Sequence, residues 1–110
     1  MTSSDKLTEY GWSFQVKAIA AMFSDRGFMQ QIADIIQPEY FESDANIWIL
    51  EVILNHFKEY KQPPSKDVLK VKITDVTDEV LKVAILEQLK EIFRYIESDD
   101  LKFVKDEILT

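Results

Sequence analysis

The stretch IWILEVILNHFKEYKQ, residues 47–62, decides the fold class of this chain. Its first eight residues are apolar on nearly every side of a helix, but they are also rich in the β-branched and aromatic residues that favour strands. A buried strand is therefore the competing interpretation. Length decides against it, because Phe57 and Tyr60 continue the helical spacing to give about 17 residues without a turn signal. We predict a long helix at the centre of a helical bundle.

Two apolar stripes precede this helix, each with the spacing of three or four residues that marks one helix face. They are Trp12, Val16, Ile19 and Phe23, and then Phe28, Ile32, Ile35 and Ile36. Pro38 is predicted to end the second helix, because the residue before a proline avoids the α region. The expected N-cap of the second helix is Ser24 or Asp25. That of the long helix is Ser43 or Asp44.

The prolines of KQPPS, residues 61–65, break the chain after the long helix, and Ser65 is predicted to cap a short helix. A further long helix should start near Asp78, and a turn at 97–100 should lead into a last one. We therefore predict an all-α fold: a small bundle of about four short helices over 11–73, followed by a C-terminal helical hairpin over 78–110. Residues 1–10 are expected to be flexible. The last apolar stripe runs to the end without a C-cap signal, which indicates a truncated hairpin in a fragment of a longer protein.

Two adjacent aromatic residues, Tyr40 and Phe41, occupy the break before the long helix, where polar turn residues are usual. We predict that they plug the end of the bundle. Full burial of each would contribute about 1.5–3 kcal/mol.

Composition excludes several classes of function. The net charge of −7 repels nucleic acid, and the absence of cysteine excludes disulfides and thiolate metal sites. Two glycines cannot build a phosphate-binding loop, so no nucleotide binding is expected. There is no secretion signal and no apolar run long enough for a membrane span, which points to the cytoplasm.

Candidate catalytic and metal-binding residues all have a simpler structural interpretation. His56 has Val52 and Tyr60 at the helical positions where a second metal ligand would be needed. Trp12 and Trp48 lie in apolar stripes and are expected to pack in the core. The carboxylates Asp75, Asp78, Glu79, Glu97, Asp99 and Asp100 cluster at predicted helix starts and turns, where they cap helices. We predict no catalytic, cofactor or metal site and no enzymatic activity in this chain.

The predicted hairpin is the candidate surface for self-association or partner binding. Its residues are Leu81, Ile85, Leu89, Ile92, Phe93, Ile96, Leu101, Val104 and Ile108. A second stripe, with Val80, Ala84 and Leu86, cannot also be covered by the short last helix, and an exposed apolar stripe often marks a contact site. The alternative is that the 11–73 bundle covers this second stripe.

Two motifs give the chain a resemblance to a known family. The segments PEYFESDANIW, residues 38–48, and KEYKQPPSKDVLK, residues 58–70, resemble the N-terminal domain of DnaB-type replicative DNA helicases, particularly those of T-even-like bacteriophages. The match covers roughly residues 14–108. The chain departs from the family in its PPSKD turn and in lacking a Glu-rich opening to the first helix.

The resemblance implies a collar domain of a hexameric ring, which dimerises through the hairpin and docks primase, with a helicase loader as a further candidate partner. ATP and Mg²⁺ would belong to a motor domain absent from this chain. The alternative is a stand-alone acidic helical phage adaptor or inhibitor of a host protein. The reading frame after Thr110 would separate the two. A helix-turn-helix DNA-binding protein is disfavoured, because no basic recognition helix is visible.

Overall fold

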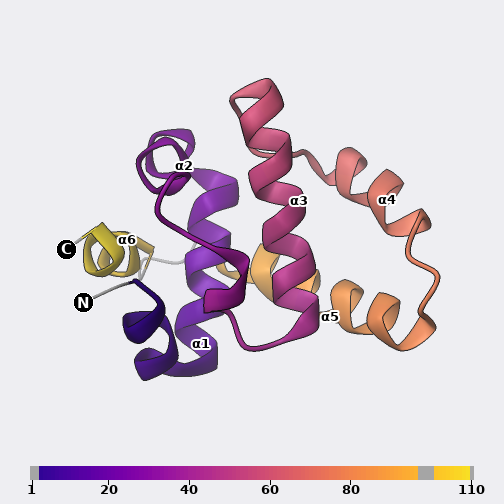
Figure 1. The fold of residues 1–110 in the computed structure, drawn as a ribbon, viewed down its shortest axis with the longest axis horizontal. Helices are drawn as coiled ribbons and strands as arrows, with labels where there is room; N and C mark the ends of the chain where they lie inside the picture. Colours follow the sequence, from indigo (N-terminus) through magenta and orange to yellow (C-terminus); the bar gives the residue numbers. More distant parts are fainter. Residues whose placement is uncertain (1–2, 97–100, 110) are drawn as a thin grey trace.

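The computed structural model describes residues 3–96 and 101–109, with side chains from residue 14 onward. Within these ranges the chain forms six α-helices, one short 3-10 helix and no strand, which confirms the all-α class. The elements are α1 (Ser3–Ser24), α2 (Arg26–Ile32), η1 (Pro38–Tyr40), α3 (Asp44–Tyr60), α4 (Lys66–Thr74), α5 (Glu79–Tyr95) and α6 (Leu101–Leu109) (Figure 1).

The predicted long helix is α3, and it has the expected 17 residues. It begins where the side chain of Ser43 accepts a hydrogen bond from the Asn46 N–H at 3.0 Å. This bond satisfies one of the backbone donors that the first turn of a helix leaves unpaired. Ser65 caps α4 and Asp78 caps α5 in the same way, so the helix starts follow from local sequence signals.

The central helix of the fold is α1, whereas the sequence had favoured α3. From Phe14 to Met22 nearly every side chain of α1 is buried. It packs against α2, α3, α5, α6 and η1. Ala18, Ala20 and Ala21 keep its surface narrow, which allows neighbouring helices to approach closely. By contrast, α3 leaves Glu51 and Asn55 exposed to solvent.

The N-terminal segment is helical from Ser3, within the stretch 1–10 for which the sequence predicted flexibility, and that flexibility stays a prediction. Gly11 lies inside this helix. One glycine costs roughly 0.5–1 kcal/mol relative to alanine, too little to end a helix whose following turns are buried.

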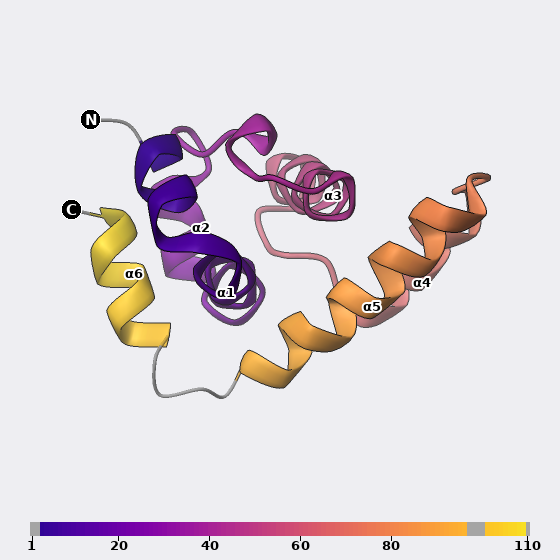
Figure 2. The ribbon, with the colours of Figure 1, turned by 90° about the horizontal axis from the view of Figure 1, so that it is seen from below.

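The expected hairpin is not formed. Helix α5 packs on α1 and α3, whereas α6 packs on α1 (Figure 2). In Figure 2 the two helices lie on different sides of α1. The apolar stripe of α5 is therefore covered by α1 and α3, and that of α6 by α1, rather than by each other. The sequence pattern identified the buried faces, but it does not specify which neighbour covers them.

The break before α3 carries the aromatic pair. Helix α2 ends at Ile32, before Pro38 rather than at it, and η1 then lies between α1 and α3. Phe41 is only 3% exposed and belongs to the core, while Tyr40 is half-buried against it. The Glu42 N–H donates to the Oε1 of the buried Gln15 on α1 at 3.3 Å. The break is thus fixed to α1 by packing and by a hydrogen bond.

An ion pair joins α2 to α6. Asp25 caps α2 by accepting from the Phe28 N–H at 3.0 Å, and its other carboxylate oxygen accepts from Lys105 Nζ at 2.9 Å. The hydrogen bond from Lys105, followed by that from Phe28, holds the pKa of Asp25 below its usual value. Because folding lowers this pKa, the stabilisation is fully present above the pKa of the unfolded chain and is lost as the pH falls through the folded pKa.

We expect Lys105→Met to lower the free energy of unfolding by about 0.5–1 kcal/mol at neutral pH, because it removes a partly exposed ion pair but leaves the cap intact. The difference from wild type should shrink in acid as Asp25 becomes protonated. Urea unfolding of Lys105→Met and wild type, at neutral pH and in acid, measures this difference in the free energy of unfolding. Lys102→Met on the same helix is the control, because its pair with Asp106 is highly exposed. An equal loss for Lys105→Met at both pH values would contradict the assignment.

Candidate functional site

The residues predicted to form an association surface lie mostly inside the folded chain. Buried residues are Ile85, Leu89, Ile92, Leu101, Val104 and Ile108, and half-buried ones are Leu81, Phe93 and Ile96. Phe93 packs against Phe23 of α1, with ring centroids 5.4 Å apart. Six of the nine are buried and three are half-buried, so in the folded chain this set contributes mainly to the core.

A different stripe on α5 is exposed. Val80, Val83 and Leu86 are 82%, 53% and 51% exposed. Their spacing of three residues places them along one side of the helix, away from the buried stripe. Val80 and Leu86 belong to the second stripe identified in the sequence, and the rest of the bundle does not cover them.

A hollow of about 360 Å³ adjoins this stripe. It lies between the N-terminal ends of α3 and α5, and its lining includes Val80, Leu81, Ala84 and Gln88. The Gln88 side chain is buried, and its Nε2 has no hydrogen-bond partner among the described residues. The Asn46 amide on α3 is also buried without a partner there. Such unpaired amides are costly, and Gln88 lines a hollow open to a further molecule.

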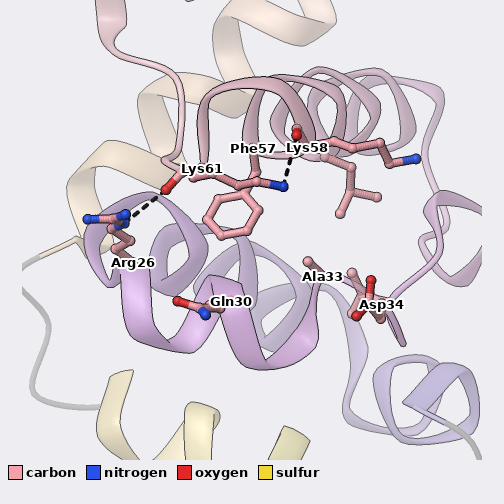
Figure 3. A pocket seen from close by; sticks show the side chains of 9 residues that line it. Arg26, Gln30, Ala33, Asp34, Phe57, Lys58 and Lys61 are labelled. Carbon is pink, nitrogen blue, oxygen red and sulfur yellow. Dashed lines mark hydrogen bonds between the residues drawn. The ribbon is translucent and has the colours of Figure 1, made fainter.

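A larger cleft, of about 500 Å³, separates α2 from the C-terminal half of α3 (Figure 3). We call it the α2–α3 cleft. Its apolar lining comes from Ala33, Ile36, Leu54 and Phe57. Its charged lining comes from Arg26, Asp34, Lys58 and Lys61. In Figure 3 the Phe57 ring lies at the centre, with Arg26 towards one end and Asp34 towards the other.

Backbone geometry at the end of α3 positions the cations of this cleft. Lys61 adopts the left-handed conformation, with φ 60°, and its N–H donates to the Phe57 carbonyl at 2.7 Å. Its own carbonyl accepts from Arg26 Nε at 2.8 Å. Lys61 Nζ donates to the Lys58 carbonyl at 3.2 Å. Sequence reasoning missed this cleft, because its residues come from two separated segments and the usual glycine signal for such a helix end is absent.

We expect Lys61→Gly to raise the free energy of unfolding by about 0.5–1 kcal/mol, because a side chain with a Cβ is strained in the left-handed region and glycine is not. The backbone carbonyl that holds Arg26 is retained. Lys58→Gly, inside the last turn of α3, should instead destabilise by about 1 kcal/mol. Chemical unfolding of both variants is the measurement. A Lys61→Gly chain less stable than wild type would show that the lysine side chain outweighs the backbone strain.

Among the other candidate residues, His56 and Trp48 pack against neighbouring side chains and Asp78 caps a helix. The half-buried His56 packs against Tyr60, with ring centroids 4.6 Å apart. Trp48 is half-buried against the core, whereas the side chains of Trp12, Glu97, Asp99 and Asp100 lie outside the described residues. Asp78 accepts from the N–H groups of Val80 and Leu81, as its predicted capping role requires. The described side chains include no cluster of three or more potential metal ligands.

Comparison with protein-family models, with curated proteins and with solved structures gives no match. Among the described residues, no helix combines the length and the apolar character needed to cross a bilayer.

Proposed function

We propose that this chain is a non-catalytic protein-association domain, and specifically the N-terminal collar and primase-docking domain of a hexameric replicative DNA helicase of bacteriophage type. The observation that carries the association role is the exposed stripe of Val80, Val83 and Leu86 on α5. Apolar side chains gathered on one exposed helix face favour contact with another protein.

The helicase assignment is supported by the two sequence motifs and by the structural roles of their residues. In the first motif, PEYF provides η1 and the buried Phe41. In the second, PPS provides the turn and the Ser65 cap that starts α4. On this proposal, ATP and Mg²⁺ act in a separate motor domain, and the protein works in the host cytoplasm.

The reading frame downstream of Thr110 tests the helicase assignment directly. A RecA-like domain with a Walker motif is the expected finding. A stop codon there would remove the helicase assignment and would favour the alternative, a stand-alone adaptor.

We expect the chain to form a dimer through the exposed stripe of α5, with the same patch on both subunits. Val83→Glu combined with Leu86→Glu should shift it to a monomer, because the two carboxylates would be desolvated at the interface. Both positions face solvent, so the monomer should remain folded. Sedimentation equilibrium with circular dichroism measures both properties.

Phe103→Glu on α6 is the matched control, since Phe103 is an equally exposed apolar residue on a different helix. It should leave the dimer intact. A wild-type chain that stays monomeric at high concentration would refute self-association. Loss of the dimer in Phe103→Glu alone would move the interface to α6.

A further inference from the structure

The α2–α3 cleft gathers positive charge in an acidic chain. Arg26, Lys58 and Lys61 line it, although the net charge of the protein is −7. Within the ranges that the structure describes, none of the three forms an ion pair with a carboxylate, including Asp34 on the same lining. Three cations that line one cleft with a single carboxylate, Asp34, and form no ion pair with it are a feature that folding alone does not require.

A structural explanation accounts for only part of this cluster. Lys58 and Lys61 lie at the C-terminal end of α3, where cations stabilise the negative end of the helix dipole. Arg26, however, is the first residue of α2, where the positive end of the α2 dipole disfavours a cation. Its hydrogen bond to the Lys61 carbonyl at the end of α3 is a structural reason for its position, but that bond uses only Nε.

The geometry of Arg26 leaves it able to bind an anion. Its Nε is committed to the Lys61 carbonyl at 2.8 Å, which holds the guanidinium at one end of the cleft (Figure 3). No described residue pairs with its terminal N–H groups. A guanidinium held in this way can donate two parallel hydrogen bonds to one carboxylate. The lysine ammonium groups can donate hydrogen bonds to a second carboxylate.

The floor of the cleft is apolar. Phe57 and Ile36 are buried, and Leu54 and Ala33 are half-buried. A ligand that fills the cleft therefore meets cations at the rim and apolar atoms below. Because Phe57 is almost completely covered, it cannot serve as a stacking platform for a nucleotide base. The acidic surface elsewhere also repels a polyanion that extends beyond the cleft.

We propose that the α2–α3 cleft is a docking site for an acidic peptide segment of a partner protein, with carboxylates bound by Arg26, Lys58 and Lys61 and an apolar side chain packed against the half-buried Leu54 and Ala33. This site is separate from the α5 stripe, so the two surfaces can be tested independently.

The experiment pans a phage-displayed library of random dodecapeptides against the whole chain. Selected peptides should combine Asp or Glu with at least one large apolar residue. Their affinity, measured by fluorescence anisotropy, should fall at least about ten-fold in Arg26→Glu combined with Lys58→Glu and should weaken as salt is added. Replacing Glu by Gln in the peptide should weaken binding to a similar extent.

Two further variants separate binding from folding and from net charge. Lys61→Gly should fold at least as stably as wild type and still bind less tightly, because it loses the lysine side chain with its ammonium group but keeps the backbone carbonyl that holds Arg26. Lys70→Glu combined with Lys90→Glu makes the same change in net charge at exposed positions outside the cleft, and it should bind as wild type does.

Three results would overturn the proposal. The first is a selection that yields no peptides above background or yields peptides without acidic residues. The second is equal binding by Arg26→Glu with Lys58→Glu and by the Lys70→Glu with Lys90→Glu control. The third is a single-stranded thymidine oligonucleotide that binds at the cleft more tightly than the selected peptides, which would assign the cations to nucleic acid instead.

Discussion

Replacing Phe41 with alanine should lower the free energy of unfolding by about 3–5 kcal/mol, the range found when a fully buried aromatic residue is truncated. Phe41 is 3% exposed and follows η1, which packs against both α1 and α3. The loss combines the transfer of the ring to water with the cavity left behind. Part of the cavity cost persists, because the surrounding backbone cannot collapse freely into the space.

Two hydrogen bonds restrict that collapse. The Phe41 N–H donates to the Pro38 carbonyl at 3.1 Å, and the Glu42 N–H donates to Gln15 Oε1 at 3.3 Å. Chemical unfolding of Phe41→Ala is the measurement, with Glu39→Ala in the same exposed turn as the control, expected within about 0.5 kcal/mol of wild type. A loss below about 1 kcal/mol for Phe41→Ala would refute the interpretation of PEYF as a plug.

The features that the sequence predicted correctly are those with local causes. Ser43, Ser65 and Asp78 each cap a helix through a side-chain oxygen two or three residues from the N–H that it accepts, so adjacent residues suffice to identify them. The length of α3 follows in the same way, from continuous helical spacing up to the KQPPS break. The burial of Phe41 was predictable because a large aromatic residue in a helix break has few other favourable positions.

The features that it did not predict depend on which segments meet in space. The stripe of Ile85, Leu89 and Ile92 shows that α5 has a buried face, but α6 and α1 are equally apolar candidates to cover it. Helices α1 and α3 are the neighbours of α5, and α1 also covers α6, because α1 is buried on almost all sides and needs several partners. A hairpin with α6 would have left one side of α1 exposed to water, at a large cost in apolar area.

The candidate site was missed for the same physical reason. Arg26 lies 35 residues from Lys61 in the chain, and only the packing of α2 and of α3 against α1 brings its guanidinium to the Lys61 carbonyl. The sequence pattern also did not predict the buried side-chain amides of Gln15 and Gln88, because glutamine is usually a surface residue. Gln15 is buried because it supplies an acceptor to the backbone of the break, a demand that the sequence does not reveal.

The largest effect is expected for Ile92→Glu, which should leave the chain largely unfolded at neutral pH. Ile92 is completely buried on the face of α5 that meets the rest of the core. An ionised carboxylate placed there without a partner costs several kcal/mol, comparable to the whole stability of roughly 5–15 kcal/mol for a domain of this size. Burial raises the pKa of such a carboxyl group, so the destabilisation should lessen as the pH falls and the group becomes neutral.

Leu86→Glu on the same helix is the matched comparison, because Leu86 is 51% exposed and belongs to the opposite stripe. At a protein concentration at which both chains are monomeric, it should stay within about 0.5 kcal/mol of wild type. Circular dichroism during urea unfolding, at neutral pH and in acid, measures both variants. The two substitutions introduce the same charge six residues apart, so net charge and helix propensity cancel and only the face of α5 differs. Two results would contradict this assignment of the faces of α5: Ile92→Glu folding as stably as Leu86→Glu, or Leu86→Glu being the variant that unfolds. Either result would mean that the stripe of Val80, Val83 and Leu86 faces the core, and the proposed association surface would then have to be abandoned.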